Sequence, residues 1–289
     1  MRGALRRQRR QARQWALATR VPTPPMFPPP YTPPATLLSQ LRGHGHAVLE
    51  PDAAAALCGT RLADLQALAP SWDDLPPDTY LRDGGHYRRR RHSCYVVDAD
   101  GVQAAPRRAH WQSLDYNALH GGMQRWFEPV PGAIAAAPAW NALLSGLAGL
   151  CSRLRDEPRW FVEAHQFRID TAGGIGRPTP EGAHRAGVDF VAVFLVAREG
   201  IKGGETRVFV ADGPDGQRFT LTRPWSLLLL DDARVIHEST PITPEGRPEV
   251  EGIAAPAHRD TLVLTFRAGG FQGDDKDGGF QGDAATIAG

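Results

Sequence analysis

The chain has 289 residues, 42% of them hydrophobic, and its 33 Lys and Arg side chains nearly balance its 32 Asp and Glu side chains. Such a chain can bury a substantial core, and a formal net charge of +1 argues against a nucleic-acid-binding protein, which would be strongly basic. No apolar run reaches the ~18 residues of a membrane span. Three scattered cysteines predict reduced thiols in a cytoplasmic protein rather than a disulfide framework.

The two ends of the chain differ from its middle. Residues 1–35 form a basic, proline-rich extension, whose arginines either contact an acidic partner or membrane surface or belong to a solvated helix without a partner. Residues 269–289 are rich in Gly and Asp and repeat Phe-Gln-Gly-Asp, so we expect a flexible tail whose phenylalanines could still dock. Residues 36–268 are predicted to form one domain between them.

The front half of this domain is predicted to be mainly helical. The clearest helix carries apolar residues at helical spacing, and prolines and glycines indicate a loop before the arginine-rich strand. Helices are predicted at 37–41, 51–68 and 138–154, strands at 46–49 and 88–97, and a loop at 70–86.

The second half is predicted to be strand-rich. Short runs of β-branched and aromatic residues alternate there with Gly, Pro and Asp turns, and there is no βαβ alternation or Gly-rich phosphate loop. Strands are predicted at 161–169, 188–196, 205–211, 219–222, 226–230 and 261–266. This order favours a mainly β protein with buttressing helices (α+β), a cupin-like jelly roll or double-stranded β-helix.

Two histidines flank this strand block. His184 precedes the strand at 188–196, and His237 follows the strand at 226–230. A jelly roll brings such strand ends together, and two neutral imidazoles there can bind Fe(II). The usual non-haem iron site adds a carboxylate two residues after the first histidine, but Ala186 stands at that position. On spacing alone, both histidines could equally be surface or core residues.

Arginine side chains predict where an anionic ligand would bind. Arg259 opens the last predicted strand and shares one face with Thr261, so its guanidinium fork could grip a carboxylate. The alternative is a surface ion pair.

Four further residues are candidates for binding a substrate. Gln166 and Arg168 share one face of a strand and would be pocket residues if that face points inward. Arg88 could bind a substrate carboxylate, or its side chain could face solvent. Trp126 could cover the pocket, or it could belong to the hydrophobic core.

An ordered series of motifs resembles the bacterial 2-oxoglutarate/Fe(II)-dependent dioxygenase family that includes isoleucine dioxygenase. The resemblance covers roughly residues 36–267 and implies a double-stranded β-helix, Fe(II), 2-oxoglutarate and O2, and hydroxylation of a free amino acid or close derivative. It makes His184 and His237 iron ligands and Arg259, with Thr261 as a possible helper, the 2-oxoglutarate clamp. The motifs are Glu163-Ala-His-Gln-Phe-Arg-Ile, Pro178-Thr-Pro-Glu-Gly-Ala-His-Arg, Gly203-Gly-Glu-Thr, Asp232-Ala-Arg-Val-Ile-His-Glu-Ser-Thr-Pro and Arg259-Asp-Thr-Leu-Val-Leu-Thr-Phe.

Ala186 departs from the His-x-Asp pattern of that family. Losing the carboxylate raises the net charge of the iron–2-oxoglutarate centre from −1 to zero, and a chloride beside the small methyl group would restore it. Halogenases of this superfamily resemble this arrangement, with Ala or Gly in place of the acid. The sequence therefore predicts chlorination of an unactivated C–H bond, with two alternatives: a hydroxylase whose ligand is altered, or a binding protein without catalysis.

Overall fold

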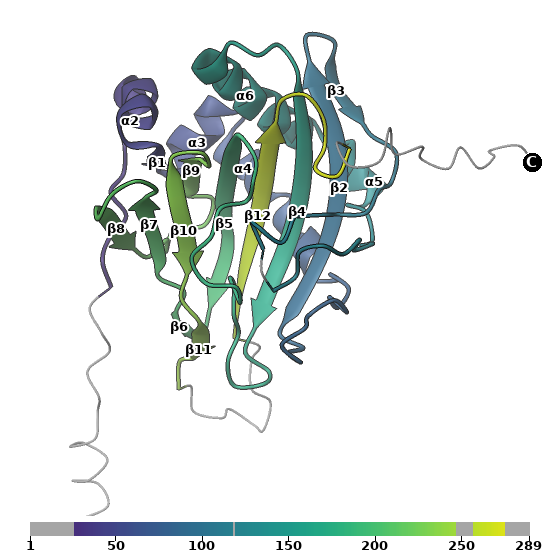
Figure 1. The fold of residues 1–289 in the computed structure, drawn as a ribbon, viewed down its shortest axis with the longest axis vertical. Coiled ribbons are helices and arrows are strands. Elements are labelled where there is room, and N and C mark those ends of the chain that lie inside the picture. The colour runs from purple at the N-terminus through teal and green to yellow at the C-terminus, as the bar shows by residue number, and fades with distance from the viewer. Residues whose placement is uncertain (1–25, 118, 247–256, 275–289) are drawn as a thin grey trace, which may run out of the picture.

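The computed structural model describes residues 26–117, 119–246 and 257–274 (Figure 1). From residue 26 onward the proline-rich segment lies along the domain, because Tyr31 forms a parallel bridge with Val48 and the Thr32 N–H donates to the Val48 carbonyl at 2.7 Å. The arginines of this extension, which lie between residues 2 and 20, are outside the described residues.

The helices belong mainly to the front half, as predicted. Gly45 ends α2 with a φ of 73°, a left-handed conformation that costs glycine little. The single helix predicted at 51–68 is two short helices, because the chain turns at Gly59 with a φ of 69°. The helices are η1 (Pro34–Thr36), α2 (Leu37–His44), α3 (Pro51–Leu57), α4 (Leu62–Gln66), η2 (Ala69–Trp72), α5 (Gly132–Ala135) and α6 (Pro138–Arg155).

Strands dominate the second half. Instead of the predicted strand at 219–222, the structure has β8 at Gly216–Phe219. Four short strands were not predicted: β3, β6, β10 and β11. The strands are β1 (His46–Leu49), β2 (Arg88–Asp98), β3 (Gly101–Ala104), β4 (Trp160–Asp170), β5 (Phe190–Glu199), β6 (Ile201–Gly203), β7 (Thr206–Val210), β8 (Gly216–Phe219), β9 (Leu227–Asp231), β10 (Val235–Ser239), β11 (Ile242–Pro244) and β12 (His258–Arg267).

These strands form one large and two small antiparallel sheets. The seven-stranded sheet has the order β1-β9-β5-β12-β4-β2-β3, and the small sheets have the orders β10-β7-β8 and β11-β6. Strands distant in sequence are neighbours, so that β12 pairs with both β4 and β5. This is the jelly roll with buttressing helices that the sequence predicts.

Alternation along the long strands divides the large sheet into two different faces. On β4, Val162 and Ala164 belong to the core shared with the helices, whereas His165 and Phe167 line a pocket on the opposite face. Figure 1 shows the helices gathered behind and above the long strands. Trp140 of α6 is fully buried in that core, and truncating such a residue costs about 3–5 kcal/mol.

The described start of the C-terminal segment, residues 269–274, packs against the domain. Phe271 is only 5% exposed and contacts the ring of Phe161 edge to face at 5.1 Å. Residues 275–289, including the second Phe-Gln-Gly-Asp, lie outside the described residues. Within the described ranges no helix combines the length and apolar character of a membrane span, and the three cysteines are free and buried.

Candidate active site

His184 and His237 lie side by side in the wall of one pocket. The His184 N–H donates to the His237 carbonyl at 3.1 Å, and the His237 N–H donates to the His184 carbonyl at 3.0 Å. Their ring centroids are 4.8 Å apart, and both side chains line the pocket. The backbone bridge therefore brings together two imidazoles that are 53 positions apart in the numbering of the chain.

The state of each imidazole suits a metal ligand. Nδ1 of His184 lies 3.0 Å from the Gly182 carbonyl and donates to it, so Nε2 is the ring nitrogen that can bind a metal ion. Burial, followed by the nearby His184, lowers the pKa of His237 to about 3, so this ring is neutral near pH 7. Among the described residues, Nδ1 of His237 is buried without a hydrogen-bond partner. A metal ion fits this pair because one of its buried nitrogens lacks a protein partner.

The backbone around Ala186 is held firmly. Asp232 accepts hydrogen bonds from the N–H groups of Ala186, Gly187 and Val188 at 2.9, 2.7 and 3.2 Å. From the other side, Nε2 of Gln272 donates to the Ala186 and Gly187 carbonyls, both at 2.8 Å. The carboxylate of Asp232 is thus committed to fixing this turn, and the Ala186 side chain lines the pocket beside His184.

A different carboxylate lies next to His184. Oε1 of Glu181 is 3.4 Å from Nε2 of His184, and the Glu181 side chain also lines the pocket. Two donor atoms that bind one metal ion at about 2.1 Å lie about 3.0–3.4 Å apart, so this spacing is compatible with a shared ion. Glu181 therefore offers an acid group where Ala186 offers none.

Arg259 and Thr261 both line the same pocket, as their shared strand face predicts. Arg259 is 5% exposed, and its guanidinium makes no hydrogen bond within the described part of the chain. Burial, then the neighbouring Arg198, lowers the pKa of Arg259 to about 10, although Asp260 opposes this. It remains charged near pH 7, and a buried cation of this kind favours an anionic ligand.

Three more arginines form part of the pocket wall. Arg88 and Arg90 come from β2, and Arg125 comes from a loop that is bridged to His110. Arg88 donates to Asp78 at 2.7 Å, and Arg125 donates to Gln112 at 3.0 Å. Even so, Nη2 of Arg88 and the Nε atoms of Arg90 and Arg125 are buried without partners among the described residues.

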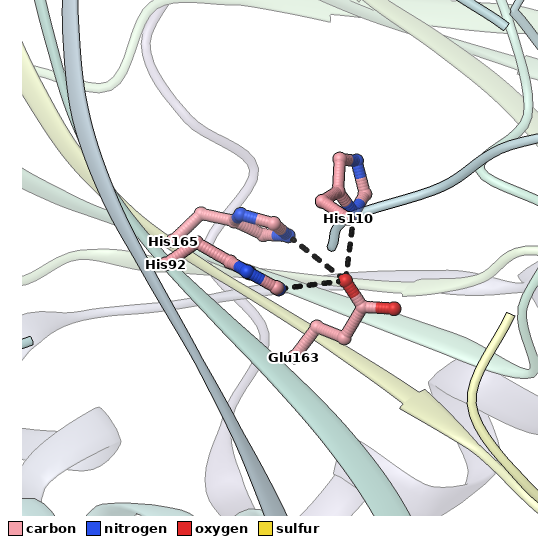
Figure 2. A group of neighbouring side chains, drawn as sticks. All are labelled: His92, His110, Glu163 and His165. Atoms are coloured by element: carbon pink, nitrogen blue, oxygen red, sulfur yellow. Dashed lines mark hydrogen bonds and ion pairs between the residues drawn. The ribbon is translucent and has the colours of Figure 1, made fainter. Parts of the chain in front are cut away.

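A second group of potential metal ligands lies deeper in the sheet. Its ligand atoms all lie within 4.8 Å of one another, so the group could hold a metal ion. Figure 2 shows three imidazoles converging on one oxygen of the carboxylate. Sequence reasoning missed the group, although the alternation of strand residues could have indicated that two members share the inner face of β4. Its members are His92, His110, Glu163 and His165.

Hydrogen bonds already occupy much of this second group. Oε2 of Glu163 accepts from His92 at 2.8 Å and from His110 at 2.6 Å. Burial lowers the pKa of His110 to about 3, and it also lowers the pKa values of His92 and His165, so the imidazoles are neutral. Burial would raise the pKa of Glu163, but its histidine contacts hold that pKa well below the usual range.

Three substrate candidates do not line the pocket. Gln166 donates to Ser71 at 2.7 Å, and Arg168 forms an ion pair with Asp260 at 2.7 Å, both on the sheet face that the helices cover. Trp126 is 44% exposed and is not part of the pocket wall. The expectation that these residues face the pocket is therefore wrong, whereas Arg88 does line it.

Comparison with known proteins identifies the family. The sequence model described as 2OG-Fe dioxygenase matches residues 69–265. A crystal structure of a bsmA homolog from Methylobium petroleophilum PM1 is 54% identical, covers 84% of this chain and 96% of that chain, and superposes with a TM-score of 0.78. Among curated proteins, none matches the chain.

More distant structures share the fold alone. IDO from Bacillus thuringiensis is 15% identical with a TM-score of 0.63, and it covers 81% of this chain and 95% of that chain. The Fe(II)/(alpha)ketoglutarate-dependent dioxygenase TqaL is 18% identical with a TM-score of 0.59, and it covers 81% and 86%. The chain belongs to the 2OG-Fe dioxygenase family, whose members are oxidoreductases that use Fe(II) and 2-oxoglutarate.

Proposed function

We propose that this oxygenase binds its iron through His184 and His237 and grips the far carboxylate of 2-oxoglutarate with Arg259, with Thr261 beside it. The observation that carries this proposal is the presence, in one pocket, of two adjoining imidazoles and the buried Arg259, whose guanidinium makes no hydrogen bond with the described residues. Neutral imidazoles suit Fe(II), and a guanidinium fork matches a carboxylate.

The deeper histidine group is the less suitable place for the iron. Nη2 of Arg90 lies 2.7 Å from Nδ1 of His165. Arginine can only donate, so this nitrogen must accept, and the proton of the neutral ring is then on Nε2. That proton points toward Glu163, whose oxygen is 3.8 Å away, and it blocks the nitrogen that a metal ion would need. The adjoining cation opposes a metal ion as well.

For the reaction we propose chlorination of an unactivated C–H bond. Fe(II), 2-oxoglutarate and O2 together supply the oxidising power, and the small side chain of Ala186 leaves room for chloride next to His184. The balanced reaction takes R–H, chloride, a proton, 2-oxoglutarate and O2 to R–Cl, succinate, CO2 and water. The protein's own share is to place the C–H bond and to exclude water.

The substrate that we propose is a free amino acid or a close derivative. The pocket combines guanidinium groups with the carboxylate of Glu181, and these groups are complementary to a carboxylate and an ammonium group. The family resemblance supports the same class.

Hydroxylation is a second candidate, and the position of Glu181 favours it. If Oε1 of Glu181, 3.4 Å from Nε2 of His184, coordinates the iron, then a protein carboxylate fills the position intended for chloride. The product would then be an alcohol. A binding protein without catalysis would turn over no 2-oxoglutarate at all.

The decisive experiment is an anaerobic titration with Fe(II) and 2-oxoglutarate, followed by turnover in O2. We expect the weak visible band of an iron–keto-acid chelate in the native protein, and its loss in His184→Ala and His237→Ala. His46→Gln, which alters a histidine on β1, is the control. A band that survives in His237→Ala but disappears in His165→Gln would move the iron to the deeper group.

Product mass distinguishes the two reactions. Chlorination requires chlorine isotopes in the product and a rate that depends on chloride. Hydroxylated product at every chloride concentration, together with a loss of iron affinity of about 10-fold or more in Glu181→Gln, would instead establish the second candidate.

A further inference from the structure

We propose that Arg88 and Arg125 form a second anion-binding subsite, which takes the carboxylate of the substrate while Arg259 takes that of 2-oxoglutarate. The inference rests on the proposed function, and it assigns the substrate to the class of carboxylic acids. It also assigns a function to Arg88 and Arg125, which bind neither the iron nor 2-oxoglutarate in the proposed site.

The two anion sites are separate places on one sheet. Ile169 of β4 pairs with Arg88 on one side and with Arg259 on the other. The two arginines are therefore two strand spacings apart, about 10 Å at the backbone. Both side chains line the pocket, so Arg88 and Arg259 can each bind a different carboxylate at the same time.

The guanidinium groups of Arg88 and Arg125 are held in place, but each keeps a donor atom without a partner. Arg88 is 6% exposed and Arg125 is 2% exposed, and each is anchored by one hydrogen bond, to Asp78 and to Gln112. Nη2 of Arg88 and Nε of Arg125 remain buried without partners in the described part of the chain. Leaving donors of charged groups unsatisfied is costly, and a carboxylate that accepts one charge-assisted hydrogen bond from each arginine would satisfy them.

Carboxylates hold the subsite arginines in place. Burial would raise the pKa of Asp78, but Arg90 and Arg88 hold it below its ordinary value, so Asp78 is ionised. Besides Asp78, the carboxylates of Glu163 and Glu181 act on the guanidinium group of Arg125. The histidines between them are neutral.

His110 can add a second contact beside this subsite. Its Nδ1 donates to Glu163 at 2.6 Å, so the lone pair of the neutral ring is on Nε2. The backbone bridge between His110 and Arg125 places the two residues next to each other on the pocket wall. A hydrogen-bond donor close to the substrate carboxylate, such as an ammonium group, is complementary to this nitrogen.

The test compares acids with their amides. The full-length protein is loaded with Co(II) and 2-oxoglutarate, and binding of each of the common L-amino acids and of the matching L-amino acid amides is measured by calorimetry. We expect at least one amino acid to bind about 10-fold or more tightly than its amide. In Arg88→Gln and Arg125→Gln this preference should disappear, while binding of 2-oxoglutarate is retained.

Arg89→Gln is the matched control, because Arg89 is the next residue on β2 and its side chain is 46% exposed. It should keep the preference for the acid. Equal binding of acids and amides, no binding of any acid, or a preference that persists in both arginine variants would overturn the subsite. If the native protein does not bind 2-oxoglutarate at all, the proposed function itself is overturned. If Arg125→Gln fails to fold, Arg88→Gln and the acid–amide comparison decide.

Discussion

His184 and His237 exchange both backbone hydrogen bonds of an isolated antiparallel bridge, at 3.1 and 3.0 Å. This contact fixes the separation of the two imidazoles before any metal binds, because β10 holds one residue and the Asp232-anchored turn lies next to the other. Preorganisation of this kind lowers the entropic cost of metal binding.

Arg259→Gln should weaken 2-oxoglutarate binding. Removing one partner of a buried, charged hydrogen-bonded pair costs about 2–5 kcal/mol, which corresponds to a loss of affinity of about 30-fold or more. The affinity of Arg259→Lys for 2-oxoglutarate should lie between those of the native protein and Arg259→Gln, because lysine keeps the charge but lacks the planar guanidinium group. The measurement is the dissociation constant of 2-oxoglutarate from the anaerobic chelate band. An unchanged constant in Arg259→Gln would assign the co-substrate to another arginine.

Ala186→Asp should restore the usual carboxylate ligand. The turn at 186–188 is already held by Asp232, so the new side chain enters the pocket without rebuilding the backbone. We expect tighter Fe(II) binding by about 10-fold or more, hydroxylated product and no chloride dependence. Ala186→Asn has the same size without the charge and serves as the control. Equal iron affinities in all three proteins would indicate that the metal is not beside residue 186.

His110 should make the protein sensitive to mild acid. Burial lowers its pKa from 6.5 to about 3 in the folded state, so the unfolded chain takes up the proton first as the pH falls. The stability that His110 contributes is therefore complete above its unfolded pKa and is lost as the pH falls toward its folded pKa. From about pH 7 to about pH 5 this loss is about 2 kcal/mol.

Urea unfolding of the metal-free protein at both pH values measures this effect. His110→Gln can still donate to Glu163 but does not titrate, so its stability should fall by about 2 kcal/mol less than that of the native protein over the same interval. The pKa of Glu163 is lowered, and its contribution is lost only at more acidic pH. Parallel pH profiles for the two proteins would contradict a buried, neutral His110.

Gln272→Ala should loosen the turn that carries Ala186. The side chain donates two hydrogen bonds to this turn, and each contributes about 1 kcal/mol. We expect a loss of stability of about 2 kcal/mol and faster hydrogen exchange at residues 186–188. Gln103→Ala, at an exposed position of β3, is the control. Unchanged exchange at the turn would show that residues 271–274 pack on the domain without supporting the site.

The fold was predictable because its signals are local and repeated. The strand at 46–49 and the helix at 138–154 agree with the structure to within a residue, since a short apolar strand and a long amphipathic helix have clear periodicities. The missed strands β6 and β11 have three residues each, which is too short for a pattern. The helix predicted at 51–68 failed at Gly59, whose turn depends on a left-handed conformation.

The sequence did not show which face of the sheet each candidate side chain occupies. Both faces of β4 are buried, one under the helices and the other in the pocket, so hydrophobic alternation cannot tell which side Gln166 and Arg168 occupy. Contacts between strands decided it, because Glu163 and His165 meet His92 only through the register of β2 with β4. By contrast, His184, His237 and Arg259 follow from motif order, and all three line one pocket.

The location of the iron is the central claim, and anomalous scattering at the iron edge tests it most directly. Crystals of the full chain grown anaerobically with Fe(II) and 2-oxoglutarate should give one strong peak at about 2.0–2.2 Å from a ring nitrogen of His184 and of His237. The keto-acid end of 2-oxoglutarate should bind the same ion, with its far carboxylate on Arg259. A peak among His92, His110 and His165, with none between His184 and His237, would contradict the account.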